Sequence, residues 1–389
     1  MPIVNRISAY HDDMREWRRD IHKHPELAYN EHRTASKVAE LLKTFGVDEI
    51  VEGIGGTGLV GVIRNGEGRS IGLRADMDAL PITEDTGVPY SSVNEGVMHA
   101  CGHDGHTTML LGAAKYLAET KNFSGTVVLI FQPAEEGYAG ARAMMDDGLF
   151  DRFPVDEIYG VHNMPGVAQG EITVSPGPVM AAADSFLVTV RGSGGHGAMP
   201  HLAIDPVVAA ATMVSSIQSL VSRAANPHDT LVISVTKING GDAFNVIPDA
   251  VTFGGTVRYF DQDLGKKNLE RMTKMIEGVA AGHGVTVEIK YDRGYPPTSN
   301  HEKQAGFARD IAVDVTGIKA KRQPQVMGSE DFSFYLQDKP GAYAWIGNGD
   351  NSESAQLHNP HYNFNDEILP VGASFFVRLA ETALTKNAI

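Results

Sequence analysis

Four polar clusters in the sequence follow apolar segments and carry side chains that could bind a metal ion. The first holds the only cysteine of the chain, Cys101, together with His103, in the stretch MHACGHDGHT. The others contain Glu135 and Glu136 in FQPAEEG, His162 in GVHNMPG, and His358 in LHNPHYNFND. Thiolate, imidazole and carboxylate groups together form a ligand set for a borderline transition-metal ion.

Each cluster alone also fits a structural role. A lone cysteine before a helix can be a small buried residue, paired glutamates usually lie in a solvated loop, and a histidine at a strand end is more often structural. The clusters gain weight together because all four fall where strands or helices end, which is where α/β sheets place ligand sites. Adjacent glutamates also allow one carboxylate to bind metal while its neighbour serves as a base.

Other chemistries lack their motifs. The sequence has no H-E-x-x-H for a helix-borne zinc site and no G-x-S-x-G for a serine nucleophile. GIGGTG at 53–58 matches G-x-G-x-x-G, but a dinucleotide site needs a helix directly after it, and LVGVIRNG reads as a strand. A hairpin-type turn is therefore the better interpretation of this stretch.

The segments that position the clusters alternate between helix and strand patterns up to about residue 182. HTTMLLGAAKYLAET has helical apolar spacing, and GTVVLIFQP and VDEIYGVHN are β-branched or apolar runs. This alternation predicts an α/β domain with a mainly parallel central sheet. The segment after Ala182 follows the order β-α-β-β-α-β, typical of a ferredoxin-like unit. We therefore expect a catalytic domain in two parts, 1–182 and 294–389, and an inserted domain at 183–293.

Composition excludes several classes of protein. The 389 residues carry a formal net charge of −15, which argues against a nucleic-acid or anionic-membrane surface. No run of about 18 apolar residues occurs, so no membrane-spanning helix is expected. The charged N-terminal segment does not resemble a signal peptide, and one cysteine cannot form an intrachain disulfide, so we expect a cytoplasmic protein.

The polar clusters, with further blocks, resemble the signatures of the M20-type metallopeptidases. The blocks are RADMDALPI, MHACGHDGHT, FQPAEEG, GVHNMPG, GGHGAMPH, AFNVIPD, SEDFSFY and LHNPHYNFND. The resemblance extends from about residue 20 to about residue 366. It is closest to the branch of hippurate hydrolases, N-acyl-amino-acid amidohydrolases and plant auxin-conjugate hydrolases. It implies a zinc-exopeptidase-like catalytic domain, a lid or dimerisation domain, and a homodimer or a tetramer formed through the lid.

The resemblance also implies a centre of two divalent ions per subunit, with Zn, Mn, Ni or Co depending on the member. It assigns Glu135 as general base and His196 as donor to the developing oxyanion, from its own subunit or the partner's. Asn245 and Arg258 would hold the substrate carboxylate. The metal ligands that it implies are Cys101, His103, Glu136, His162 and His358.

One block departs from the wider superfamily, whose first metal motif is usually H-x-D. RADMD has Arg74 instead of a histidine, and Cys101 is expected to compensate. Asp76 and Asp78 would then either orient an imidazole or have structural roles. His201 and Asp331 are expected to be structural, and Glu330 is left unassigned.

The predicted reaction is hydrolysis of the amide bond of N-acyl amino acids, with aromatic, hippurate-like acyl groups as the leading choice. A carboxypeptidase, aminoacylase or dipeptidase would share every motif and differ only in its substrate pocket. A non-catalytic metal-binding module would keep the ligands but need no base, and the presence of Glu135 beside Glu136 argues against it.

Overall fold

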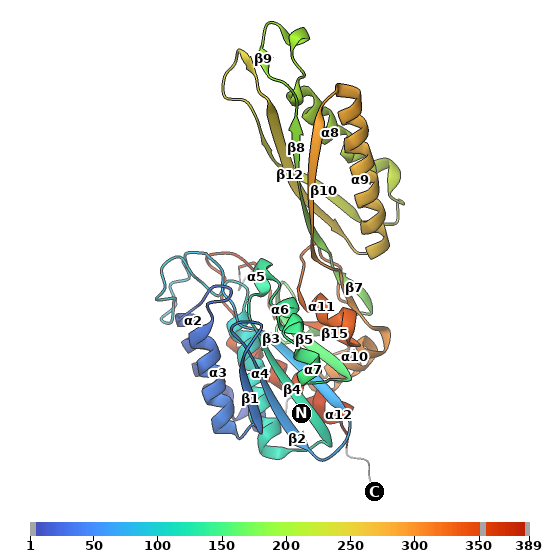
Figure 1. The fold of residues 1–389 in the computed structure, drawn as a ribbon. Coiled ribbons are helices and arrows are strands. Elements are labelled where there is room, and N and C mark those ends of the chain that lie inside the picture. The colour runs from blue at the N-terminus through green and yellow to red at the C-terminus, as the bar shows by residue number, and fades with distance from the viewer. Residues whose placement is uncertain (1–4, 351–354, 386–389) are drawn as a thin grey trace. The chain divides into compact units, whose positions relative to one another are not determined.

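The computed structural model describes residues 5–350 and 355–385. Contacts between residues divide the chain into two compact units (Figure 1). The first comprises Met1–Gly177, Ser299–Pro324 and Asp331–Ile389, and the second comprises Pro178–Thr298 and Gln325–Glu330. The second unit thus extends beyond the segment 183–293 expected from the sequence. Its second segment belongs there because Val326 exchanges backbone hydrogen bonds with Val179 and Ala181, a long-range pairing that no local pattern indicates.

Seven strands form the sheet of the first unit: β1 (Glu49–Ile54), β2 (Gly58–Asn65), β3 (Ser70–Asp76), β4 (Gly125–Gln132), β5 (Glu157–Pro165), β6 (Ile172–Thr173) and β15 (Gly341–Gly349). Their order is β1-β2-β4-β3-β5-β15-β6. Only the central strands β4-β3-β5-β15 pair in parallel, and the outer pairings are antiparallel. The sheet, expected to be mainly parallel, is thus parallel at its centre and antiparallel towards both edges. One cause is GIGGTG, which forms the tight turn of a β1-β2 hairpin, as predicted.

Parallel pairing brings the polar clusters to one edge of this sheet. Strands β3, β4 and β5 run in the same direction, so their carboxyl ends lie side by side. Asp78 follows β3, Glu135 follows β4, and His162 lies near the end of β5. Ligand sites of α/β sheets form at such edges, because the loops that leave neighbouring strands converge there.

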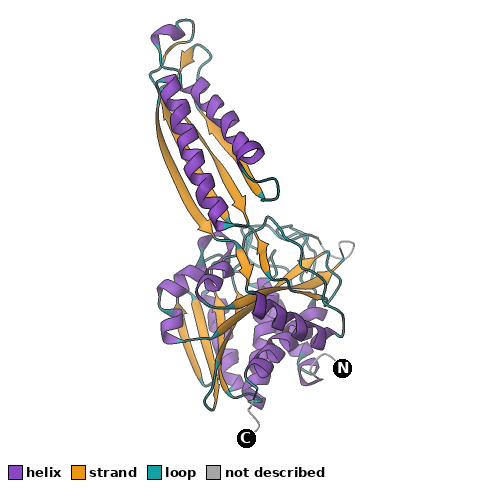
Figure 2. Cartoon of the chain, turned by 90° about the vertical axis from the view of Figure 1, so that its right-hand side faces the viewer, coloured by secondary structure: helices purple, strands orange, loops and turns teal. Residues whose placement is uncertain are grey.

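Helices lie against the sheet (Figure 2), and several of them form a large hydrophobic core with it. Helix α4 (His103–Thr120) is buried on nearly all sides, and the apolar face expected from its spacing, including Met109, Leu110 and Leu117, is in the core. The helices of this unit are α1 (Asn5–Ser8), α2 (His11–Lys23), α3 (His32–Phe45), α4 (His103–Thr120), α5 (Glu135–Tyr138), α6 (Gly140–Asp146), α7 (Leu149–Arg152), α10 (Glu302–Thr316), α11 (Phe332–Asp338), η3 (Asp366–Ile368) and α12 (Leu369–Ala383).

The second unit has the predicted βαββαβ order. Its elements are β8 (Ala183–Arg191), α8 (Pro206–Ser219) with the π-helical turn η2 (Leu220–Ala224), β10 (Leu231–Asn239), β12 (Ala250–Tyr259), α9 (Gln262–His283) and β13 (Thr286–Tyr295). The sheet is antiparallel in the order β10-β12-β8-β13. Both helices begin at aspartate caps, because Asp205 and Asp261 accept backbone N–H bonds in the first turn. Met213, Phe253 and Ile276 belong to a core separate from that of the first unit.

Short elements complete the chain. The pair β9 (Gly195–His196) and β11 (Val246–Ile247) forms a small sheet of its own, followed along the chain from β9 by η1 (Pro200–Leu202). The pair β7 (Gly177–Met180) and β14 (Thr298–Asn300) forms another.

By length and composition alone, one helical segment could span a membrane. Among the described residues, Pro206–Ala224 is long enough to do so and has a mean hydropathy of 1.2. Polar residues such as Ser215 and Gln218 interrupt its apolar runs, so a search for uninterrupted runs misses it. Length and composition are weak evidence here, because α8 is one layer of the βαββαβ unit and buries Ala210, Met213 and Ile217 in its core.

Candidate metal centre

Cys101 lies in the loop before α4, and His103 is the first residue of α4. Gly102 lies between them with φ of 90°, in the left-handed region that favours glycine. A Cβ there would lie 2.2 Å from Nδ2 of Asn163, so the space also requires glycine. Gly105 has a different role from Gly102, since its φ is not left-handed and a Cβ would lie 2.2 Å from the ring of Phe364. The first glycine therefore bends the chain, and the second admits a neighbouring ring.

The two glutamates follow β4 in a loop that is only nominally helical. Glu136 has ψ of 70°, outside the helical region, so consecutive side chains point in different directions. Its Oε1 lies 3.2 Å from Nε2 of His358 and 3.9 Å from Nε2 of His103. Glu135 is buried, and its Oε1 accepts the backbone N–H of Asp331 at 3.3 Å.

His162 and His358 approach this loop from two other segments. Nε2 of His162 lies 3.4 Å from Sγ of Cys101. The Nδ1–H of His162 donates to the carbonyl oxygen of Asn163 at 2.6 Å, which leaves Nε2 as an acceptor in the neutral ring. His358 has a left-handed backbone with φ of 62°, and its N–H donates to the carbonyl of Ala100 at 2.8 Å. Its side chain is 52% exposed, so it lies at the open side of the cluster.

The structure brings the five predicted ligands and the predicted base into one cluster. Within these six residues, three groups have ligand atoms within 4.8 Å of one another: Cys101 with His103 and His162, Cys101 with Glu136 and His358, and His103 with Glu135 and Glu136. Cys101, His103 and Glu136 each belong to two of these groups. Among the described residues, Nε2 of His103 is buried without a hydrogen-bond partner. The thiol, imidazole and carboxylate groups of the cluster fit a transition-metal ion, and so does the Nε2 atom of His103 that lacks a hydrogen bond.

Buried charges set the protonation of this cluster. Burial, with the carboxylates of Glu136 and Glu135, raises the pKa of the Cys101 thiol well above its ordinary value. Burial lowers the pKa of His162 well below its ordinary value, so this ring is neutral. Burial also opposes protonation of His103, but Asp76 and Asp78 outweigh it and raise its pKa to about 10. A bound cation would replace these protons on the thiol and on His103, because metal ligands must be deprotonated.

Two buried aspartates support the imidazoles. Oδ1 of Asp78 accepts from Nδ1 of His103 at 3.1 Å, and its Oδ2 accepts from the backbone N–H of Glu136 at 2.9 Å. Oδ1 of Asp76 lies 2.6 Å from Nδ1 of His106, whose Nε2 accepts the backbone N–H of Asn163. Of the two roles considered for each aspartate, the geometry thus favours orientation of an imidazole. His106 is bonded through both nitrogens and is structural.

Arg74 and Asp331 form a second buried network under the glutamate loop. The Arg74 guanidinium donates to Asp76 at 2.8 Å, to Gln132 at 2.8 Å and to Asp331 at 3.0 Å. A guanidinium is always charged here and cannot bind a cation, so Arg74 is no ligand. Asp331 also accepts the backbone N–H of Ala141 at 2.9 Å, which supports the structural role expected for it.

Sequence reasoning missed the supports supplied by α2. Arg18 and His22 are fully buried, and both reach Oδ2 of Asp104, at 3.1 Å and 2.8 Å. Asp104 adjoins His103 in the first turn of α4, so α2 holds the segment that carries a predicted ligand. Asn163 was missed as well, although its Nδ2 donates to the carbonyl of Cys101 at 2.6 Å. Helical spacing of Arg18 and His22, four residues apart on an otherwise apolar face, was the available signal.

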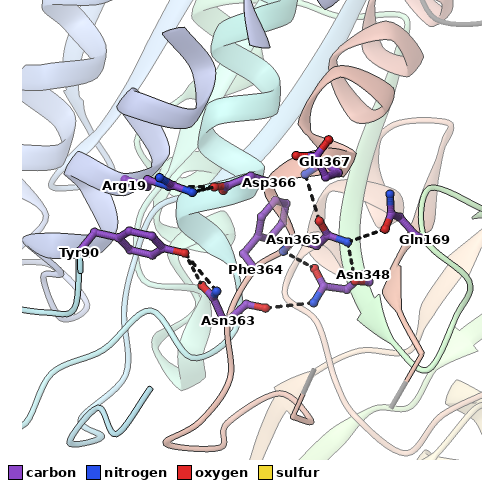
Figure 3. A pocket seen from close by; sticks show the side chains of 9 residues that line it. All are labelled: Arg19, Tyr90, Gln169, Asn348, Asn363, Phe364, Asn365, Asp366 and Glu367. Carbon is purple, nitrogen blue, oxygen red and sulfur yellow. Dashed lines mark hydrogen bonds and ion pairs between the residues drawn. The ribbon is translucent and has the colours of Figure 1, made fainter. Parts of the chain in front are cut away.

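A pocket of about 380 Å³ lies beside this region in the first unit (Figure 3). Its wall is polar, and its amides bond one another: Nδ2 of Asn348 donates to the carbonyl of Asn363, and the N–H of Asn365 donates to Oδ1 of Asn348. The Phe364 ring in the wall also lies 6.4 Å from the ring of His106. None of the predicted ligands lines this pocket.

The remaining predicted residues belong to the second unit and do not gather within it. His196 pairs with Val246 between β9 and β11, and the N–H of Gly197 donates to the carbonyl of Asn245 at 2.8 Å, so His196 and Asn245 are neighbours. Arg258 lies towards the opposite end of β12 from Ala250, which follows β11 closely. The strand from Ala250 to Arg258 spans about 26 Å at the usual rise per residue. Burial lowers the pKa of Arg258, which donates to the hydroxyl of Thr256.

Known proteins are similar to this chain in sequence and in fold. The profile of Peptidase family M20/M25/M40 matches residues 72–382. Hippurate hydrolase of Campylobacter jejuni subsp. jejuni is 43% identical over 384 residues, covering 98% of this chain and 99% of that protein. IAA-amino acid hydrolase ILR1-like 5 of Arabidopsis thaliana is 41% identical over 392 residues, with 98% and 89% covered. The crystal structure of the Bacillus subtilis YXEP protein, a dinuclear metal-binding peptidase from the M20 family, matches with a TM-score of 0.86 and 35% identity over 97% of this chain and 99% of that one. The chain therefore belongs to peptidase family M20/M25/M40, as the motifs of its sequence predict.

Proposed function

We propose that this protein is a metal-dependent amidohydrolase that cleaves N-acyl amino acids into a carboxylic acid and a free amino acid. The observation that carries the proposal is the pair of adjacent glutamates, because Glu136 faces His358 while an oxygen of Glu135 lies within 4.8 Å of ligand atoms of His103 and Glu136. A storage site would need the ligands alone. A carboxylate placed beside the ligands supplies the base that hydrolysis of an amide requires.

The centre would be held by Cys101, His103, Glu136, His162 and His358. When bound there, a divalent ion such as Zn, Mn, Ni or Co polarises the scissile carbonyl and lowers the pKa of a water molecule. Glu135 takes a proton from the attacking water as the new C–O bond forms. It then passes that proton to the leaving nitrogen as the C–N bond breaks. His196 donates a hydrogen bond to the tetrahedral oxyanion, a contribution of about 3–4 kcal/mol for one such donor.

The second unit serves in this proposal as a lid and a dimerisation surface. About 26 Å of strand separates the neighbours His196 and Asn245 from Arg258 at the usual rise per residue, so one second unit does not present all three groups together. This separation supports a homodimer in which His196 of the partner subunit completes each site. Exposed apolar side chains around β9 and α8, including Leu202, Val208 and Phe244, support an interface at this end of the unit.

Arg258 would hold the free carboxylate of the amino acid, since a planar guanidinium binds both oxygens. Substrates with an esterified or amidated carboxylate should therefore bind poorly. Relatives named for hydrolysis of hippurate and of IAA-amino acids support an aromatic acyl group on the substrate. Aminoacylase, carboxypeptidase or dipeptidase activity is the second candidate, favoured by the relative named Thermostable carboxypeptidase 1, which is 36% identical.

The test measures free amino acid released from a panel of N-acyl amino acids and dipeptides, with Mn²⁺ or Zn²⁺ added and with EDTA. We expect metal-dependent release, fastest from benzoylglycine-like substrates and abolished by EDTA. Preferential cleavage of dipeptides would favour the second candidate. Absence of release with every metal would contradict catalysis and favour a metal-binding module. Sedimentation of the same preparation would test the homodimer.

A further inference from the structure

The loop that carries Glu135 and Glu136 is held in an unfavourable backbone conformation. Ala134 and Ala139 flank the glutamates with φ of 55° and 56°, in the left-handed region that alanine rarely adopts. Gly140 follows, where a Cβ would lie 1.7 Å from the carbonyl oxygen of Pro133. Left-handed non-glycine residues persist only where surrounding contacts fix them. The contacts of Ala134 therefore decide where the next residue, Glu135, points.

The side chain that fixes Ala134 is Glu31. This carboxylate is fully buried, and its Oε1 accepts the backbone N–H of Ala134 at 2.8 Å. Its Oε2 accepts the hydroxyl of Thr57, in the turn between β1 and β2. One carboxylate thus ties the start of α3 and the β1-β2 turn to the glutamate loop. Other buried carboxylates bond further along this loop, at Glu136 and Ala141.

The side chain of Glu31 does not cap the helix that it precedes. It occupies the N-cap position of α3, yet its side chain makes no capping hydrogen bond there. The first turn of α3 is capped instead by Glu26, whose carboxylate accepts the N–H groups of Arg33 at 3.0 Å and Thr34 at 2.8 Å. Two nearby glutamates therefore divide two tasks, and only Glu31 faces the glutamate loop.

We propose that Glu31 is a positioning residue, which fixes the left-handed backbone of Ala134 and thereby the aim of the Glu135 carboxylate. This inference rests on the proposed function, in which Glu135 is the base. Removal of Glu31 would let Ala134 relax toward an ordinary conformation and turn Glu135 away from the water that it activates. Misplacement of a catalytic group by about 1 Å can cost about a hundredfold in rate. Glu136 keeps its own bond to Asp78, so the metal should remain bound.

Glu31→Ala should lower kcat about a hundredfold, with KM and metal content unchanged. Glu31→Gln should keep most of kcat, because the amide oxygen can still accept from Ala134 and the amide NH₂ can donate to the hydroxyl of Thr57. The double variant Glu31→Ala with Ala134→Gly should recover much of the lost kcat, since glycine adopts a positive φ without strain. A purely structural role for Glu31 would not produce this rescue.

Glu26→Ala is the matched control. It removes a partly buried glutamate bonded to backbone N–H groups of α3, so it should lower the melting temperature and leave kcat unchanged. If Glu31→Ala does not fold, Thr57→Val replaces that variant in the test. Thr57→Val should also lower kcat with KM unchanged, because it removes the hydroxyl that holds one oxygen of the Glu31 carboxylate.

Wild-type kcat in folded Glu31→Ala, or in Thr57→Val where the first variant does not fold, would overturn the inference. So would a double variant no faster than Glu31→Ala while both hold full metal. Glu135→Gln run in parallel separates this failure from failure of the proposed function. Normal turnover in Glu135→Gln would remove the base itself, whereas a slow Glu135→Gln beside a fast Glu31→Ala would refute only the positioning role.

Discussion

Asp78 offers a sharp test of the metal centre because one buried carboxylate supports two proposed ligands. Its Oδ1 holds Nδ1 of His103 at 3.1 Å, and its Oδ2 holds the backbone N–H of Glu136 at 2.9 Å. Both neighbours are donors, so both oxygens are needed as acceptors. Asp78→Asn keeps the size of the side chain but places an NH₂ group against one of these N–H donors.

The magnitude follows from what the substitution disrupts. Loss of the partner that orients a metal-binding imidazole typically costs 10–100-fold in metal affinity, which is about 1.4–2.7 kcal/mol. Asp78→Asn also leaves a buried N–H without an acceptor, which costs about 1–3 kcal/mol if the loop cannot relax. We therefore expect a loss at the upper end of this range, about a hundredfold in metal affinity.

The assay is competition between the protein and a chromophoric chelator for Zn²⁺, followed by absorbance. Asp184→Asn serves as the matched control, because Asp184 is a buried carboxylate bonded to the hydroxyls of Tyr259 and Tyr291 in the second unit. This control should bind metal as the wild type does. Wild-type affinity in Asp78→Asn would refute the reasoning, and so would an equal loss in Asp184→Asn.

Three further perturbations test separate parts of the account. Cys101→Ala should lose bound metal, as atomic emission would show, and unchanged metal content would defeat its role as a ligand. Arg258→Ala should raise KM for hippurate by about 10–100-fold, as loss of charged hydrogen bonds predicts, and equal loss on the carboxamide analogue would argue against carboxylate binding. Burial disfavours His22 protonation, but hydrogen bonds to Asp104 and Glu84 outweigh it and raise the pKa. A raised pKa means that protonated His22 stabilises the folded state. This contribution to the free energy of unfolding is fully present below the pKa of His22 in the unfolded chain, about 6.5, and is lost as pH rises through its pKa in the folded protein. His22→Gln should therefore lower the melting temperature more at pH 6 than at pH 9, and a loss independent of pH would contradict a charged His22.

Local patterns predicted most of the elements. The βαββαβ order follows from alternating strand and helix periodicity, and the β1-β2 hairpin follows from the strand after GIGGTG. Patterns failed where pairing is long-range. The backbone bonds of Val326 and the antiparallel outer strands of the large sheet depend on partners distant in sequence.

The candidate site divides in the same way. Residue types at element ends marked Cys101, the Glu135–Glu136 pair and His358 as candidates, and the family resemblance implied which of them bind metal. Glu31 was not predicted, since a glutamate before a helix reads as a solvent-exposed cap. Its buried bond to Ala134 spans 103 residues of sequence and depends on a backbone conformation that residue type does not reveal.

Glu135→Gln tests the central claim most directly, because it changes the proposed base and leaves all five proposed ligands in place. The measurement pairs metal content by atomic emission with turnover of hippurate by the same preparation. We predict full metal content with turnover lowered by at least about 10²–10⁴-fold, the usual contribution of a general base. Near-normal turnover with full metal would contradict the account.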